Sequence, residues 1–206
     1  MDMSAAIETV LADHGVERSG EEGESGWHPA GEVVVRGGVA MNALDAPEMM
    51  FLEALPEGRH QVYLSYRDVP REPGEDRAAR EVDAVALVAA GAGPQAVTEA
   101  EYQDEADDVN FVGEHLSALY CDAGRWAIGR ALQEVSGVAD YADHALAELR
   151  AQEASGVAHP VLSVVFDPES GANALIFPTC ADVSSTILVG RDEAGEGVCV
   201  VWADFD

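Results

Sequence analysis

Residues 161–177 read VLSVVFDPESGANALIF, and this stretch decides the fold. Two runs rich in β-branched, aliphatic and aromatic residues, 161–166 and 172–177, flank the turn sequence Asp-Pro-Glu-Ser-Gly at 167–171. Apolar runs of this length around a cluster of turn-forming residues are typical of a β-hairpin. The stretch therefore predicts two antiparallel strands.

The remainder of the C-terminal part repeats this arrangement. Residues 184–189 and 198–202 are again apolar runs, and they flank a turn over 190–197 that contains glycine at several positions. Successive strands with short connections favour antiparallel neighbours. We therefore expect the last four strands to form one antiparallel meander.

Toward the N-terminus the same patterns predict more strands and a few helices. Ala142, Leu146 and Leu149 lie on one face of a helix expected over 138–152, and Ile7, Val10 and Leu11 lie on one side of a short helix expected over 4–14. An exposed, flexible acidic loop is expected up to Gly31. Further strands are expected over residues 32–40, 60–66, 81–90 and 116–122, and a further helix over 46–55. The chain is predicted to be a single α+β domain over residues 1–206, an antiparallel β-rich sheet with a few packed helices.

The charge of the chain is strongly one-sided. Aspartate and glutamate total 39 residues against 11 basic residues, all of them arginine, which gives 11 − 39 = −28. Such a charge repels nucleic acid and anionic lipid, because phosphate binding needs cationic side chains. No nucleic acid and no membrane is therefore expected as a partner. The acidity serves either to attract a basic partner or to adapt the chain to a saline cell or a GC-rich genome.

The location and the redox state follow from what the chain contains. The start, Met1-Asp2-Met3-Ser4, has no basic flank with an apolar core, and no apolar run approaches the roughly 20 residues that span a bilayer. We expect a cytoplasmic protein. Cys121, Cys180 and Cys199 are odd in number and far apart, so reduced and mostly buried thiols are expected.

Three aspartates are the candidate site residues. Asp122, Asp182 and Asp192 each lie next to small or turn residues at an expected strand end, where a carboxylate can accept backbone N–H bonds or hold a cation. Gly124 and Gly190 would allow positive φ at two of these turns. These five residues form the candidate ligand site, for which the sequence does not specify a metal. The alternative is that the aspartates only fix the turns.

Other constellations lead to weaker hypotheses. Asp140, His144 and Glu148 share one helical face, which is either a solvated face or the place of a base or metal ligands. The acidic run 104–108 lacks the pattern of an EF-hand loop. Hydrolase, phosphate-loop and zincin motifs do not occur, so no cofactor and no catalytic residue is predicted. Three tryptophans line a pocket or, more economically, belong to the core: Trp27, Trp126 and Trp202.

Several short phrases occur in order along the chain: Leu55-Pro56-Glu57-Gly58-Arg59, Asp76-Arg77-Ala78-Ala79, Cys121-Asp122-Ala123-Gly124, Asp182-Val183-Ser184, Gly190-Arg191-Asp192, Gly195 and Asp204-Phe205. Over about residues 55–205 they resemble a bacterial family of unknown function, the domain-of-unknown-function family 4241. One departure stands at Thr179-Cys180-Ala181-Asp182-Val183, where the family has Gly-Trp-Gly-Asp-Gly; only the aspartate matches. The resemblance implies that any ligand of the Gly-rich form is lost here.

Three functional hypotheses remain. The leading one is a non-enzymatic binding or protein-interaction domain, in its sharpest form an immunity-type inhibitor of a basic partner protein. The second is a small-ligand or metal-binding protein, or an enzyme, that uses the turn aspartates. The third is a housekeeping domain whose acidity reflects the host. The sequence leaves the oligomeric state open.

Overall fold

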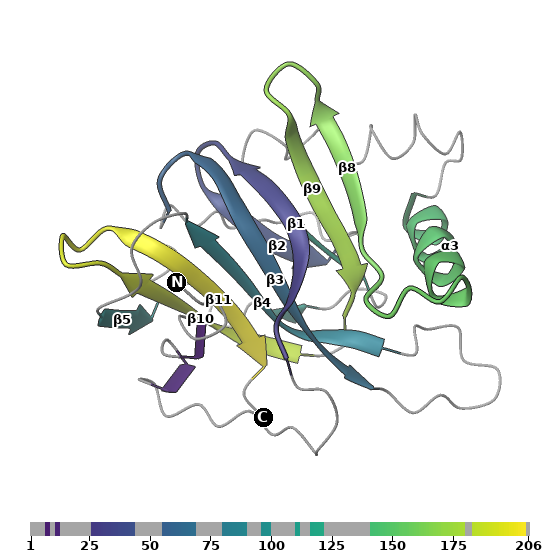
Figure 1. The fold of residues 1–206 in the computed structure, drawn as a ribbon, viewed down its shortest axis with the longest axis horizontal. Helices are drawn as coiled ribbons and strands as arrows, with labels where there is room; N and C mark the ends of the chain where they lie inside the picture. The colour runs from purple at the N-terminus through teal and green to yellow at the C-terminus, as the bar shows by residue number, and fades with distance from the viewer. Residues whose placement is uncertain are drawn as a thin grey trace.

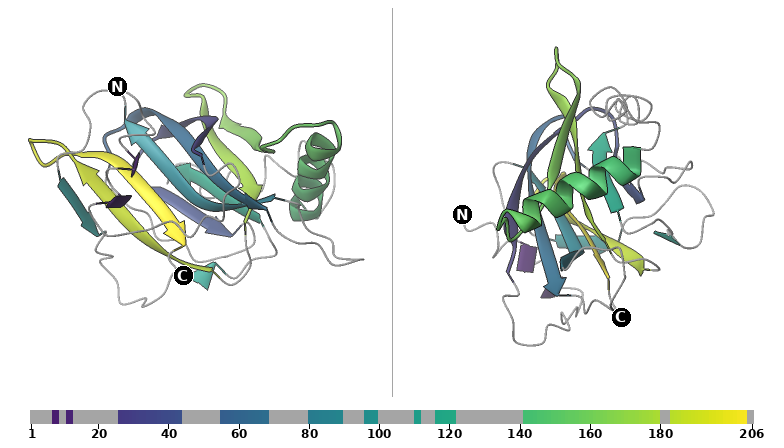
Figure 2. Two further views of the ribbon diagram at one scale, coloured as in Figure 1. Left: turned by 60° about the horizontal axis from the view of Figure 1, so that its bottom comes forward. Right: turned by 90° about the vertical axis from the view of Figure 1, so that its right-hand side faces the viewer.

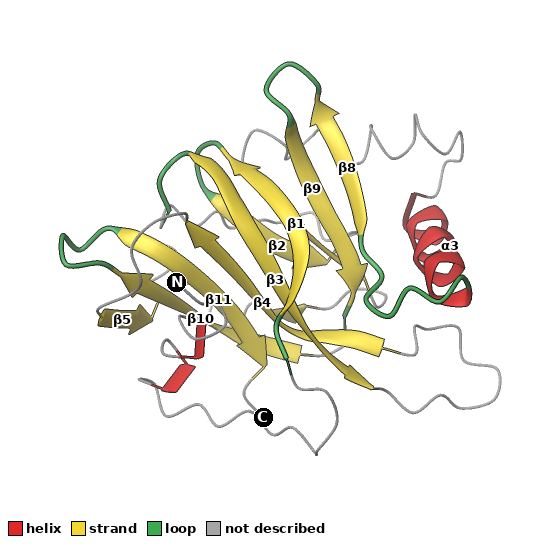
Figure 3. Cartoon of the chain, viewed as in Figure 1, coloured by secondary structure: helices red, strands yellow, loops and turns green. Residues whose placement is uncertain are grey.

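The structure is a computed structural model, and it describes residues 7–8, 11–12, 26–43, 55–68, 80–89, 96–99, 110–111, 116–121, 141–179 and 183–204. Strands dominate these residues, as Figure 3 shows. They contain one long helix, α3 (Tyr141–Ala154), together with short helical pieces at residues 7–8 and 11–12. No helix among these residues is long and apolar enough to cross a membrane.

The strands form two sheets (Figure 1). The first, seven-stranded sheet has the order β1-β3-β4-β11-β10-β5, with β6 paired to β10. The second, four-stranded sheet has the order β2-β7-β9-β8. All pairs of strands are antiparallel. The bounds of the first sheet are β1 His28–Val35, β3 Gly58–Asp68, β4 Arg80–Ala89, β5 Ala96–Glu99, β6 Asn110–Phe111, β10 Val183–Arg191 and β11 Gly197–Asp204. Those of the second are β2 Val39–Ala43, β7 Leu116–Cys121, β8 Leu162–Asp167 and β9 Ala172–Pro178.

The main core lies between the two sheets. Successive side chains of a strand point to opposite faces, so alternate residues of most of these strands enter this core. In β9 these residues are Leu175 and Phe177, and in β11 they include Trp202. All three are at most 2% exposed. Two sheets that share an apolar interface of this kind form a sandwich.

Helical residues cover the outer faces of the sandwich. Ala145 and Leu149 of α3 pack on the outer face of the second sheet, against Ile176 and its neighbours. Ile7 and Leu11 pack in the same way on the outer face of the first sheet. Figure 2 shows α3 lying across the strands of the second sheet. The expected apolar positions are therefore confirmed for Ile7, Leu11 and Leu149, and Leu146 packs partly buried against the same cluster, whereas Ala145 and not Ala142 is the fully buried alanine of α3.

The strand expected over 32–40 is wrong, because two strands lie there. β1 ends at Val35 and β2 begins at Val39, and they belong to different sheets. Between them Gly37 takes a positive φ of 73°, a conformation that glycine adopts without strain. The chain thus crosses from one sheet to the other at this glycine. The predicted loop up to Gly31 is also too long, since β1 starts at His28.

The C-terminal meander is confirmed only in its two hairpins. β8 pairs with β9 and β10 pairs with β11, as the turn sequences predict. However, β9 belongs to the second sheet and β10 to the first, so the four strands do not form one continuous meander. A β-rich α+β fold is what the described residues form.

The other predicted elements divide into confirmed and undescribed ones. β3, β4 and β7 match the predicted strands within a few residues at each end, and α3 matches the predicted helix. The helix predicted over 46–55 and the acidic run 104–108 lie almost wholly outside the described residues.

Candidate functional site

Three of the five predicted site residues, Asp122, Gly124 and Asp182, lie outside the described residues. Two described residues, Cys121 and Thr179, precede Asp122 and Asp182 in the sequence. Cys121 is the last residue of β7, whereas Thr179 follows Pro178, the partner of the first residue of β7. Cys121 and Thr179 therefore lie at opposite ends of the β7–β9 ladder.

Asp192 is the predicted site residue whose side chain the structure describes in detail, and it holds a turn together. Its Oδ1 accepts hydrogen bonds from the backbone N–H groups of Ala194 (2.9 Å) and Glu196 (3.0 Å). Its own N–H donates to the carbonyl of Glu196 at 2.9 Å. A carboxylate that accepts backbone N–H bonds two and four residues ahead is a turn-fixing group. The arrangement matches the alternative that this aspartate only fixes its turn.

Gly190 is a paired strand residue and not a turn residue. It lies opposite Cys199 in the β10–β11 ladder, just before a β-bulge at Arg191. The positive φ in this hairpin is found at Gly195, where it is 84°. The expected turn over 190–197 is thus shorter than predicted, because β10 extends to Arg191.

The helical face of His144 and Glu148 is half-buried at the histidine and exposed at the glutamate, while Asp140 lies outside the described residues. Within the described part of the chain there is no group of three or more His, Cys, Asp or Glu side chains that could hold a metal ion. Glu148 stands one helical turn before Gln152, so the two side chains share a face of α3.

The predicted core residues are confirmed where the structure describes them. Cys121 and Cys199 are free, buried thiols, and burial raises the pKa of Cys199 to about 12. Trp27 and Trp202 are at most 8% exposed and belong to apolar clusters. The indole Nε1 of Trp27 also donates to Glu8 at 2.9 Å. Cys180 and Trp126 lie outside the described residues.

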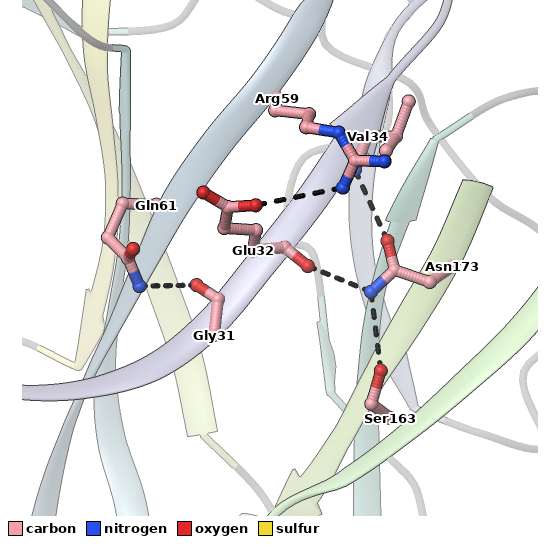
Figure 4. Close-up of polar contacts among 7 residues, drawn as sticks. All are labelled: Gly31, Glu32, Val34, Arg59, Gln61, Ser163 and Asn173. Carbon is pink, nitrogen blue, oxygen red and sulfur yellow. Dashed lines mark hydrogen bonds and ion pairs between the residues drawn. The ribbon is translucent and has the colours of Figure 1, made fainter. Parts of the chain in front are cut away.

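Sequence reasoning missed a polar contact that joins the two sheets (Figure 4). The side chain of Asn173 in β9 reaches the backbone of β1. Its Oδ1 accepts from Val34 N–H at 3.3 Å, and its Nδ2 donates to the carbonyl of Glu32 at 2.8 Å. A second contact joins Nδ2 to the hydroxyl of Ser163 at 3.4 Å. The amide thus replaces a neighbouring strand at this edge of β1.

A second side-chain amide binds the backbone next to β8. The Oε1 of Gln152 accepts from Val161 N–H at 3.1 Å, and its Nε2 donates to the carbonyl of Val161 at 3.0 Å. Both backbone groups of Val161 are satisfied by one side chain, as they would be by the peptide group of a paired strand. Gln152 therefore closes the start of this edge of the second sheet.

The two exposed large hydrophobic residues among the described ones both belong to the segment around β8. Val165 is 52% exposed and Val157 is 41% exposed.

At the end of β8, the Ser170 hydroxyl donates to Asp167, and this hydrogen bond is the main cause that lowers the pKa of that carboxyl below its usual range. β8 thus combines exposed apolar surface with a carboxylate that stays ionised.

Among the acidic side chains whose exposure the structure describes, almost all lie at the surface. Glu81, with 0% exposure, is the one buried acidic residue among them. Glu81 takes part in an interaction, so it is not an isolated charge. The others in this set are partly or fully exposed. The negative charge of these side chains is therefore displayed to solvent.

Comparisons with family models, with curated proteins and with solved structures find no match to this chain.

Proposed function

We propose that this protein is a non-enzymatic binding domain that recognises a basic protein partner. The observation that carries the proposal is the display of negative charge: the net charge is −28, and of the acidic side chains whose exposure is described Glu81 alone is buried. Charge at the surface accelerates the encounter with an oppositely charged protein and disfavours acidic partners. A partner with a basic face is the class of molecule that this surface would select.

The geometry of Asp192 supports a binding role over a catalytic one. Its Oδ1 already accepts two backbone N–H bonds within its own turn. A carboxylate engaged in this way fixes the loop, and its Oδ1 is used within the turn. This gives a structural role to one of the three aspartates on which the rival proposal of an enzyme or a metal-dependent binder depends.

The sharper form of the proposal is an immunity-type inhibitor that neutralises a basic partner in the cytoplasm. Acidic inhibitors of basic proteins gain speed from long-range attraction, which salt weakens. Membership in the family of unknown function 4241 is part of this proposal and rests on the motif resemblance alone. Neither statement requires a cofactor.

Capture from host extract followed by a salt series tests the proposal. The immobilised protein is exposed to extract at about 50 mM salt and washed at about 0.5 M, where the Debye length falls several-fold toward 4 Å. The expected result is a basic protein that is retained at low salt and released at high salt. Its purified form should then bind in solution with the same salt dependence.

A matched control separates specific charge attraction from adhesion. The variant Glu169→Gln/Glu193→Gln/Glu196→Gln removes three exposed charges, and none of these side chains makes a contact that holds the fold. It should bind the captured protein more weakly. If no basic protein is retained at low salt, the proposed function is wrong.

A further inference from the structure

β8 is an edge strand whose free side can be identified. It ends the second sheet, next to β9, and no described strand pairs with its other side. In a β-strand the N–H and C=O of one residue point to the same side, and the side alternates along the chain. Val161 gives both groups to Gln152, so they point away from β9. The backbone groups of Ser163 and Val165 therefore also point away from β9.

The edge of β1 provides the contrast. There the carbonyl of Glu32 and the N–H of Val34 are taken by the side chain of Asn173. At β8 the corresponding side-chain amide, that of Gln152, binds Val161 only. A side chain thus bridges two residues at the edge of β1, whereas no described strand pairs with the edge of β8 beyond Val161. Unpaired edges of this kind are templates for the addition of a strand.

The side chains of this edge are also accessible. Leu162, Val164 and Phe166 face α3, where they belong to or pack against the apolar cluster on the outer face. Ser163 and Val165 consequently face the opposite side, and both are exposed. β1, the last strand of the first sheet, packs against β9. In Figure 1 the β8–β9 hairpin projects beyond the ends of the neighbouring strands.

We infer that the free edge of β8, at Ser163 and Val165, binds an extended basic segment of a partner protein as an added strand. This inference rests on the proposed function, since it names the surface that the basic partner would use. Main-chain hydrogen bonds to Ser163 and Val165 supply affinity, and the exposed side chain of Val165 offers an apolar contact.

The negative charge of the chain favours a basic partner at this edge over a second copy of the chain. The segment 141–171, which contains α3 and the β8–β9 turn, has five acidic residues and one arginine. The whole chain carries −28, so two copies repel each other when their β8 edges approach. A segment that alternates basic and apolar residues does not meet this repulsion. Its apolar side chains could cover Val165 while its basic ones face the acids.

The test uses a synthetic octapeptide of alternating lysine and valine, about as long as a typical strand. A peptide of alternating glutamate and valine is its matched control. Binding is measured by calorimetry, and protection of backbone amides is measured by hydrogen exchange. We expect the lysine peptide to bind and to slow exchange at Ser163 and Val165, and the glutamate peptide to do neither.

Two variants examine the edge itself. Val165→Pro removes the outward N–H and is compatible with an edge strand. Val165→Lys keeps the backbone and adds a charge, and Ala194→Lys adds the same charge at the exposed β10–β11 turn of the first sheet. Val165→Pro should bind the lysine peptide about tenfold more weakly, as expected for one or two lost backbone hydrogen bonds. Val165→Lys should also bind it more weakly, because its charge repels the peptide and the apolar contact of Val165 is lost. Ala194→Lys should lose less than either.

The outcomes separate this inference from the proposed function. Equal binding to the native protein, Val165→Pro and Val165→Lys, without protection at Ser163 and Val165, overturns the β8 site while leaving acidic recognition intact. If Val165→Lys and Ala194→Lys lose affinity for the lysine peptide equally, the β8 site is likewise overturned and acidic recognition stays intact. Absence of binding by the lysine peptide, or self-association through β8, also overturns the inference. Capture of a basic protein from extract decides the proposed function independently.

Discussion

The side chain of Asn173 in β9 donates to the carbonyl of Glu32 in β1 at 2.8 Å, across 141 residues of sequence. The same amide accepts from Val34 N–H. One side chain therefore satisfies a donor and an acceptor at the outer edge of β1 and joins the two sheets of the sandwich. Backbone groups that are removed from water without such a partner cost free energy.

Replacing Asn173 with alanine should destabilise the protein. Two backbone groups of β1 lose their partner, and each unsatisfied group costs about 1–3 kcal/mol when it stays buried, so a total of about 2–6 kcal/mol is expected. Urea denaturation measures the change in the free energy of unfolding. Ser163→Ala is the control, because it removes only the 3.4 Å contact of the same amide and should change stability by less than about 0.5 kcal/mol. Equal effects of the two substitutions would contradict the bridging role.

This contact shows where sequence reasoning ends. The apolar run 172–177 predicts a strand, and the structure confirms it, with Ala174 and Ile176 buried on one face and Leu175 and Phe177 on the other. Nothing local to Asn173 indicates a partner 139 residues away. A long-range contact of this kind depends on how two sheets stack, which the pattern of one strand does not determine.

Other differences had a signal in the sequence. The pair Gly37-Gly38 stands inside the run that was expected to be one strand, and a glycine pair is a turn signal. The change of sheet between β9 and β10 has no comparable signal, because the hairpin turns on either side of it are alike. Of the candidate site, the role of Asp192 as a turn residue was one of the two alternatives that the sequence offered.

Gln152→Ala should open the start of the β8 edge. The substitution removes two hydrogen bonds to Val161, and a loss of about 1–2 kcal/mol in the free energy of unfolding is expected. Hydrogen exchange at the Val161 amide should accelerate with it. Glu148→Ala, one helical turn away on the same exposed face, should leave that amide protected. Unchanged exchange at Val161 in Gln152→Ala would show that the glutamine does not hold this edge.

Asp192→Asn should be nearly silent, whereas Asp192→Ala should cost about 1 kcal/mol. The asparagine keeps an oxygen that can accept from Ala194 and Glu196, and the alanine leaves both N–H groups without it. Thermal or urea unfolding of the two variants checks the difference. A larger loss in the asparagine variant than in the alanine variant would indicate that the charge of Asp192 has a role beyond the turn.

Cys199 should make the native state sensitive to alkaline pH. Burial raises the pKa of its thiol to about 12, whereas an unfolded cysteine titrates near about 8.5. A raised folded pKa contributes stability that is complete below the unfolded pKa and is lost as pH rises between the two values. The loss is about 1.4 kcal/mol for each pH unit in that window.

Cys199→Ala lacks this ionisation, so its stability should fall less steeply from about pH 8.5 upward. The free energies of unfolding of both proteins at pH 7 and pH 10 provide the measurement. Tyr66, whose pKa burial also raises, contributes to the alkaline loss in both proteins and cancels in the comparison. Parallel pH profiles would contradict a buried neutral thiol at Cys199.

Salt should stabilise the isolated protein. Like charges repel in a chain of net charge −28, and salt screens that repulsion. The melting temperature should therefore rise by several degrees between about 0.05 M and 0.5 M sodium chloride. The triple glutamine variant that lacks the charges of Glu169, Glu193 and Glu196 should show a smaller rise. A melting temperature that continues to rise steeply up to molar salt concentrations would favour adaptation to a saline host over recognition of a partner.

The affinity of the captured basic protein, measured by calorimetry in a salt series, tests the proposed function most directly. We predict that the dissociation constant rises at least about tenfold between about 50 mM and 500 mM salt, because long-range attraction to the exposed acids is screened. The rise should be smaller for the triple glutamine variant. A dissociation constant that is the same at both salt concentrations would contradict the account.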